Sequence, residues 1–171
     1  MNTKKTEIYQ EYDIAFWSQT HWSYVEMKLT EMGILTSKNF KVSFCLDKSS
    51  MFSITSNHKG KTKKHEVKPL AFIWKKFDQF HSKNTVHIDD LSRNFVLNPK
   101  NGIPIKAFKQ AVISREKDDE LKYLKDYLMK ILIHTDDVTK VRKKKKIFLI
   151  KFKKYDHRDW KKILIEKFTK K

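Results

Sequence analysis

Short apolar runs that end on polar residues recur along the chain and predict strands of an α/β domain. Residues 14–17 (Ile-Ala-Phe-Trp) stop at Ser18, and residues 85–88 stop at Asp89 and Asp90. Runs this short and this apolar are typical of buried strands in a parallel sheet. Ligands of open α/β sheets bind at the carboxyl ends of the strands, which would bring Ser18 and the two aspartates to one site.

Helical spacing of apolar residues predicts three helices. The first spans residues 21–32 and is closed by Gly33, a residue suited to the turn that follows a helix. The second begins at Pro69, which fits a first helical turn. The third spans residues 117–133 and carries acidic residues in its first turn. Its apolar stripe comprises Leu121, Leu124, Leu128, Ile131 and Leu132.

A β-hairpin is predicted between these helices. The apolar segments 42–46 and 51–54 flank the polar turn 47–50. Residues 56–65 (SNHKGKTKKH) follow and are expected to form a basic, exposed loop. Cys45 lies within the first apolar segment, so we expect an inert thiol in the core.

Composition is that of a globular chain the size of one domain. Of 171 residues, 39% are hydrophobic and 13% aromatic, too many for an intrinsically disordered protein. Gly and Pro number 3 each, which excludes collagen-like and low-complexity classes. One cysteine cannot form an internal disulfide and indicates a reducing compartment, nuclear or cytoplasmic. No apolar run approaches the ~20 residues needed to cross a bilayer, and no signal peptide is evident.

Charge is high and unevenly placed. The chain has 38 basic and 20 acidic residues, a net charge of +18, and residues 138–171 hold 15 of the basic residues against 3 acidic ones. Only four of the 38 are arginine, and lysine lacks the planar fork that grips phosphates in pairs. We therefore expect solvated lysines, with at most weak, non-specific binding of polyanions by the tail.

Other chemical motifs are missing from the sequence. The seven histidines form no HExxH motif and have no cysteine partners for zinc. His87 is therefore expected to be structural. Neither GxxxxGK nor GxGxxG occurs, which leaves a nucleotide-binding fold without support.

Three longer stretches carry a resemblance to a known family. They are residues 12–22 (YDIAFWSQTHW), 67–77 (VKPLAFIWKKF) and 87–102 (HIDDLSRNFVLNPKNG). They closely resemble the small CTD-type (FCP-like) protein phosphatases of the haloacid dehalogenase (HAD) superfamily, and most of all the group with a ubiquitin-like domain. Further segments fit the same pattern: 42–54, 119–133 and 156–164.

The resemblance implies a fold and a set of site residues. The fold is a HAD-like Rossmannoid three-layer α/β sandwich with a small β-hairpin insertion. Ser18 and Lys68 would bind the phosphate, and Asp89 and Asp90 would hold Mg²⁺, with Asp90 as the closer ligand. Each residue also has an ordinary structural interpretation: a turn serine, a solvated lysine, and a pair of turn-capping aspartates.

The family's Asp-x-Asp-x-Thr motif does not occur in the 171 residues. It supplies the aspartate nucleophile and the acid/base, so no catalytic residue is assigned. Asp13 is the one aspartate before Ser18, and Asp47 follows Ser18, in the wrong order. The resemblance places the motif on a central strand, between those ending at Ser18 and Asp90. We therefore expect a partial domain, lacking its first central strand, that is inactive and poorly stable as written.

The resulting organisation has three parts. Residues 1–138 form the partial phosphatase domain, residues 139–155 a basic insert, and residues 156–171 a basic C-terminal helix. Within the insert, residues 141–154 (VRKKKKIFLIKFKK) interrupt the family pattern. They fit either a retained intron, with a missed exon upstream, or a real basic anchor for a membrane or nucleic acid.

The predicted function is that of a Mg²⁺-dependent protein serine/threonine phosphatase domain. Its substrate would be phosphoserine in RNA polymerase II CTD-like repeats or in a proteasome subunit. Two alternatives remain open: a pseudophosphatase scaffold that binds phosphopeptides, and a tail-driven binder of nucleic acid or membrane. The ubiquitin-like domain of the similar group is absent from these residues, which puts targeting to proteasomes in doubt.

Overall fold

The computed structural model describes residues 8–39, 41–58 and 60–141. The chain falls into two compact units, Met1–Lys68 and Pro69–Lys171. The predicted C-terminal helix at 156–171 lies outside the described residues, as does the basic insert from residue 142 onward. Within the described part of the chain, no helix is both long and apolar enough to span a membrane.

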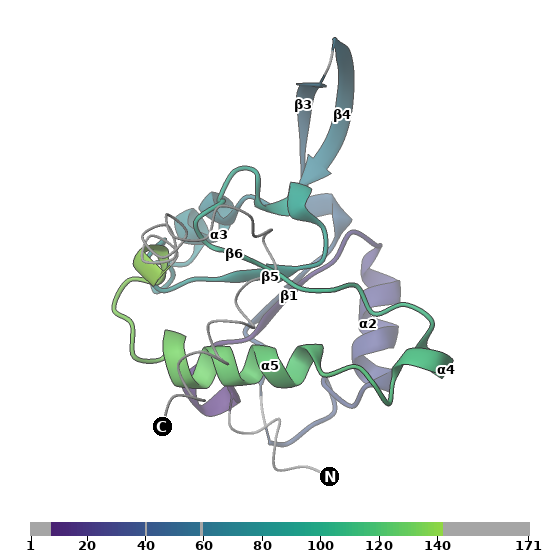
Figure 1. Cartoon of the computed structure of the whole chain (residues 1–171), viewed down its shortest axis with the longest axis vertical. Coiled ribbons are helices and arrows are strands. Elements are labelled where there is room, and N and C mark those ends of the chain that lie inside the picture. The colour runs from purple at the N-terminus through teal and green to yellow at the C-terminus, as the bar shows by residue number, and fades with distance from the viewer. Residues whose placement is uncertain (1–7, 40, 59, 142–171) are drawn as a thin grey trace. The chain divides into compact units, whose positions relative to one another are not determined.

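The first unit contains two strands paired in parallel, the α-helix Trp22–Glu31 (α2) and a hairpin (Figure 1). Its elements are β1 (Ala15–Trp17), α2 (Trp22–Glu31), β2 (Phe44–Leu46), the 3₁₀ helix η1 (Lys48–Ser50), β3 (Phe52–His58) and β4 (Lys61–Val67).

The strand predicted over 14–17 is confirmed as β1, but it is not fully buried. Ala15 is exposed and Phe16 is half-buried. β1 pairs in parallel with β2, with Phe16 opposite Cys45, and in the described residues it has no second neighbour. A strand with one free edge remains partly open to solvent, which explains the difference. Cys45 is likewise half-buried, and its burial raises the pKa of the thiol.

The helix predicted over 21–32 is confirmed as α2. It buries Val25 and Leu29, which lie one turn apart. Gly33 follows with a φ of 68°, and its N–H donates to the carbonyl of Thr30. This left-handed position is the one for which glycine is suited, so the predicted end of the helix is also confirmed.

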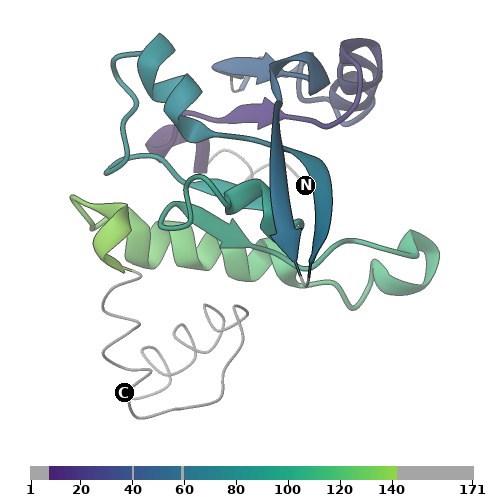
Figure 2. The same ribbon diagram turned by 90° about the horizontal axis from the view of Figure 1, so that it is seen from above.

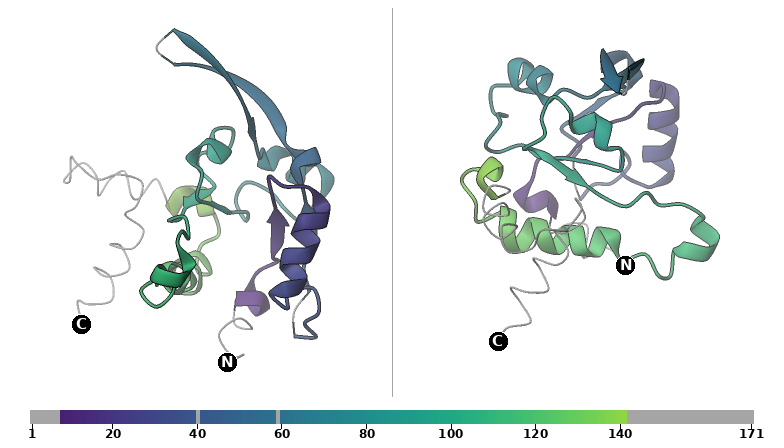
Figure 3. Two further views of the ribbon diagram at one scale, coloured as in Figure 1. Left: turned by 90° about the vertical axis from the view of Figure 1, so that its right-hand side faces the viewer. Right: turned by 45° about the horizontal axis from the view of Figure 1, so that its top comes forward.

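The predicted hairpin at 42–54 is wrong. Its first arm, β2, pairs with β1, while the second becomes the start of β3, which pairs antiparallel with β4. The true hairpin therefore spans residues 52–67, and the segment 56–65, predicted as a loop, forms most of its two arms. Gly60 lies in the turn with a φ of 75°. Figure 3 shows the two arms as a ribbon that extends away from β1 and α2.

The second unit contains a parallel strand pair and several helical segments. Its elements are α3 (Leu70–Lys76), β5 (His87–Asp89), the 3₁₀ helix η2 (Ser92–Phe95), β6 (Gly102–Pro104), α4 (Ala111–Ser114), α5 (Glu120–Tyr127) and the π-helical turn η3 (Leu128–Leu132). Figure 2 shows α5 running past the β5–β6 pair.

The two predicted helices of this unit are confirmed with different ends. Pro69 precedes α3 as its N-cap. The helix predicted over 117–133 begins at Glu120, and its last turn is π-helical. Leu121 was expected on the apolar stripe but is 71% exposed, because it turns away from the face that carries the other apolar residues. The core of the unit is formed by Leu70, Ile73, Phe95, Ile103, Leu124, Tyr127, Leu128, Ile131, Leu132 and Val138.

The strand predicted over 85–88 appears as β5, shifted toward Asp89. β5 pairs in parallel with β6, and His87 lies opposite Gly102. The described residues thus form three separate two-stranded sheets. Helices and strands alternate as an α/β fold requires, while the continuous sheet of a three-layer sandwich stays a prediction.

Candidate functional site

Ser18 lies immediately after β1, at its carboxyl end. Its backbone N–H donates to the carbonyl of Leu46 over 2.9 Å, which continues the parallel pairing by one residue. Its hydroxyl oxygen accepts from the N–H of Thr20 at 3.1 Å, and the two hydroxyl oxygens are 2.8 Å apart. The side chain therefore closes a tight turn before α2. The turn presents two hydroxyl groups at the edge of the sheet where a ligand is expected.

Asp47 joins the loop after β2 to the start of α2. One carboxylate oxygen accepts from the N–H of Trp22 at 3.0 Å, and the other accepts from the N–H and the hydroxyl of Ser49 at 2.9 and 2.5 Å. The hydrogen bonds from Ser49 are the main cause that lowers the pKa of Asp47, and that from Trp22 contributes. The N–H of Lys48 also donates to the carbonyl of Thr20 at 3.1 Å. The loops that end β1 and β2 are thus held together.

Lys68 follows the last residue of β4. Its neighbour Val67 is fully buried, and Lys68 itself is only 6% exposed. Among the residues that the structure describes, Lys68 is the one lysine classed as buried. Removing an ammonium group from water is costly, so lysine side chains are rarely buried unless they are paired. The interpretation of Lys68 as a solvated surface charge is therefore wrong.

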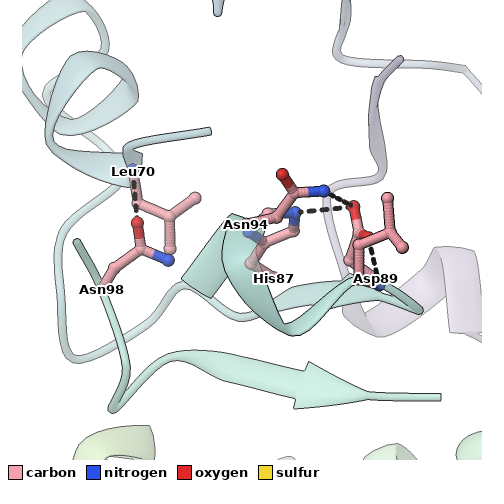
Figure 4. A network of polar contacts seen from close by, with 6 residues as sticks. Leu70, His87, Asp89, Asn94 and Asn98 are labelled. Atoms are coloured by element: carbon pink, nitrogen blue, oxygen red, sulfur yellow. Dashed lines mark hydrogen bonds and ion pairs between the residues drawn. The ribbon is translucent and has the colours of Figure 1, made fainter. Parts of the chain in front are cut away.

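Asp89 is the centre of a buried polar network at the end of β5 (Figure 4). One carboxylate oxygen accepts from the N–H of Leu91 at 2.8 Å. The other accepts from the side-chain amide of Asn94 at 2.9 Å and lies 3.5 Å from Nε2 of His87. Asn94 is fully buried, and the ring of His87 packs edge-on against Phe95, with 5.1 Å between the ring centres. His87 thus has the structural position expected of it.

Asp90 differs from Asp89 in its surroundings. Its side chain is exposed, whereas both oxygens of Asp89 already accept hydrogen bonds from the loop that follows β5. This contrast is consistent with Asp90 as the more accessible ligand. Mg²⁺ commonly takes one or two carboxylates and fills its remaining positions with water and phosphate oxygens. Two consecutive aspartates fit such an ion, although the described residues contain no cluster of three or more His, Cys, Asp or Glu side chains.

Each predicted site residue lies at the end of a strand or directly after one. Ser18 and Lys68 belong to the first unit, and Asp89 and Asp90 to the second. Their assembly into one site stays a prediction.

Sequence reasoning missed three residues of these networks: Thr20, Asp47 and Asn94. The Asp-x-Ser spacing of residues 47–49 was an available signal, because an aspartate often accepts from the N–H two residues further on.

Comparison with known proteins identifies the class. The sequence matches the NLI interacting factor-like phosphatase family over residues 4–139. The ubiquitin-like domain-containing CTD phosphatase 1 of Xenopus tropicalis is 36% identical over 163 residues, which cover 95% of this chain and 46% of the relative. The human protein of that name is 42% identical over 127 residues (74% and 39%), and that of Drosophila melanogaster is 40% identical over 140 residues (82% and 43%).

These matches place the chain among the HAD-type, FCP-like protein phosphatases. It belongs to the NLI interacting factor-like phosphatase family, and the resemblance found in the sequence is confirmed. The alternation of helices and strands is consistent with that fold. The chain spans less than half the length of these relatives.

Proposed function

We propose that this chain forms part of a Mg²⁺-dependent protein serine/threonine phosphatase domain that binds phosphoserine. The substrate would be a nuclear or cytoplasmic phosphoprotein, either RNA polymerase II CTD-like repeats or a proteasome subunit. Membership of the family supports the reaction class. The name that the relatives share supports a CTD-type substrate.

The burial of Lys68 is the observation that carries the proposal. A buried ammonium at the end of β4 offers a charge-assisted hydrogen bond to a phosphate oxygen. Ser18 would donate a second hydrogen bond through its hydroxyl, which can rotate away from Thr20. The phosphate would thus be held by the charged ammonium of Lys68 and the neutral hydroxyl of Ser18, both from the first unit.

Asp90, together with Asp89, would hold the metal ion. Bound Mg²⁺ would neutralise charge on the phosphoryl group. The hydrogen bonds from Leu91 and Asn94 fix the carboxylate of Asp89 before any ion binds, so the pair is partly preorganised.

Hydrolysis would require an aspartate nucleophile, which the resemblance assigns to an Asp-x-Asp-x-Thr motif. The 171 residues contain no such motif. We propose that these residues alone bind a phosphopeptide without turning it over. This behaviour also fits the second candidate, a pseudophosphatase scaffold. A role driven by the basic tail depends on residues 142–171, which lie outside the described part of the chain.

Binding of paired peptides tests the proposal. Fluorescence anisotropy would compare a serine peptide with its phosphoserine form, using the full 171-residue chain. The wild-type chain should prefer the phosphorylated form, and Lys68→Met, which keeps the aliphatic length but not the charge, should lower that affinity at least about tenfold. Ser18→Ala should lower it by a smaller factor, because a neutral donor is lost.

The matched controls are Lys75→Met and Ser92→Ala, at exposed positions. Both should bind as the wild type does. Equal affinity for the two peptides, or equal losses in Lys68→Met and Lys75→Met, would contradict the proposal. Far-UV circular dichroism of each variant separates a binding defect from unfolding.

A further inference from the structure

The β3–β4 hairpin carries an unbalanced positive charge. Lys61, Lys63 and Lys64 are all exposed on β4. Residues 52–67 contain a single acidic residue, Glu66. In the described part of the chain, no salt bridge involves the three lysines, and the residues opposite Lys63 and Lys64 are the neutral Ser56 and Thr55. Their charge is therefore available to a ligand.

The three lysines cover both faces of the ribbon. Successive side chains of a strand point to opposite faces, so Lys61 and Lys63 share one face and Lys64 lies on the other. Each strand has seven residues, which corresponds to a length of about 23 Å. An extended peptide of about seven residues could follow the ribbon along this length.

The hairpin is rooted in the phosphate-binding segments of the same unit. β3 begins two residues after η1, the turn that Asp47 caps and that Lys48 ties to the carbonyl of Thr20. β4 ends at Val67, directly before Lys68. The root of the hairpin thus lies beside Lys68, which is proposed to contact the phosphate, and beside η1, which is hydrogen-bonded to the turn that contains Ser18. A polypeptide whose phosphoserine is bound there has its neighbouring residues within reach of the ribbon.

We infer that the β3–β4 hairpin binds acidic residues that flank the phosphoserine of a substrate polypeptide. This inference rests on the proposed function and names the class of substrate that the site prefers. Lysine side chains attract carboxylates as compact charges on flexible stems, without requiring one fixed geometry. The hairpin would thus select for acidic sequence around the phosphoserine.

The composition of the hairpin favours a peptide over nucleic acid. Residues 52–67 contain no arginine, tryptophan or tyrosine, and their one phenylalanine, Phe52, lies at the root of the ribbon. Binding of single-stranded nucleic acid relies on aromatic stacking along the groove, and phosphate recognition favours the arginine fork. The outer edges of the ribbon also have no third strand in the described residues, so an extended peptide can lie against them.

Four labelled peptides test the inference with the full chain. They are phosphoserine peptides with Asp/Glu or with Gln/Gly flanks, and the unphosphorylated form of each. The variant K61Q/K63Q/K64Q removes the charge of the hairpin. The variant K75Q/K100Q/K109Q removes the same charge from exposed positions of the second unit and serves as the matched control.

The wild type should bind the acidic phosphopeptide about tenfold more tightly than the neutral one at low salt. The hairpin variant should lose most of this preference and keep its affinity for the neutral phosphopeptide within about twofold, whereas the control variant should keep the preference. The preference should also shrink as salt screens the charges.

Two results would overturn the inference. One is an equal loss of preference for the acidic phosphopeptide in the two triple variants. The other is binding of a single-stranded RNA that is tighter than binding of the acidic phosphopeptide and is abolished by the hairpin substitutions. Failure of the proposed function gives a different pattern, in which phosphorylation does not affect affinity for any peptide.

Discussion

Asn94→Ala should destabilise the loop after β5 more than any change at an exposed position of the same segment. Asn94 is fully buried, and its side-chain amide donates to Asp89 over 2.9 Å. Alanine removes the donor. Asp89 is only 9% exposed, so the carboxylate oxygen that loses this hydrogen bond cannot easily be solvated instead.

The expected cost follows from the type of bond. A hydrogen bond to a charged group contributes about 1.5–3 kcal/mol to stability. In Asn94→Ala this contribution is lost, because the buried oxygen of Asp89 loses its donor and gains no water in exchange. His87 remains 3.5 Å away and offsets part of the loss. We expect a decrease of about 2 kcal/mol in the free energy of unfolding, or roughly a thirtyfold change in the equilibrium constant.

Amide hydrogen exchange measured by NMR gives a local readout. The N–H of Leu91 donates to Asp89, and the N–H of Asn94 donates to the carbonyl of Leu91, so both amides report on the loop. Their protection should fall in Asn94→Ala and stay unchanged in Ser92→Ala, which alters an exposed residue of the same 3₁₀ helix. A loss of stability below about 0.5 kcal/mol, or equal to that of Ser92→Ala, would show that the hydrogen bond from Asn94 to Asp89 does not stabilise the loop.

Two further predictions concern Asp47 and Gly102. The hydrogen bonds from Ser49 lower the pKa of Asp47, so they stabilise the fold above the ordinary carboxyl pKa, and this contribution is lost as the pH falls through the lowered value. Urea unfolding should show Ser49→Ala less stable than the wild type at neutral pH and equal to it in strong acid; a difference that grows in acid would contradict the assignment. Gly102→Ala should cost about 1–3 kcal/mol in the same assay, because the added Cβ would lie 2.3 Å from the ring of Phe95. An unchanged midpoint would show that the ring can move aside.

Helices and strands that depend on the spacing of apolar residues within one segment were predictable from the sequence. The helix Trp22–Glu31 has a mixed apolar face, of which Val25 and Leu29 are buried, and a glycine follows it, so its existence and its end could both be predicted. The apolar run before Asp89 likewise locates a strand. Leu121 shows the limit, because a side chain can fit the apolar spacing of a helix and still point into solvent.

Pairing between distant segments was not predictable. Phe44 lies opposite Ala15, and this parallel register joins residues far apart in the sequence, whereas a hairpin joins neighbours. The apolar segment that starts at 42 therefore suggested a local hairpin. The true hairpin has polar and basic arms with little apolar alternation, and Gly60 was the main local signal for its turn.

The candidate site could be located only in part. Spacing indicated Ser18 and the two aspartates, because polar residues that end apolar strands are a general signal. Lys68 is one lysine among many, and only the resemblance marked it. Its burial, like the hydrogen bond from Asn94 to Asp89, depends on packing that the sequence does not display.

In the proposed site, Ser18 and Lys68 bind phosphoserine while Asp89 and Asp90 bind Mg²⁺. Amide NMR of the chain, titrated with a phosphoserine peptide and then with Mg²⁺, tests it most directly. We expect the peptide to shift the amide signals of Ser18, Thr20 and Lys68, and Mg²⁺ to shift those of the two aspartates. Peptide-induced shifts that avoid Ser18 and Lys68, or that are the same for the unphosphorylated peptide, would contradict binding of phosphoserine by these two residues.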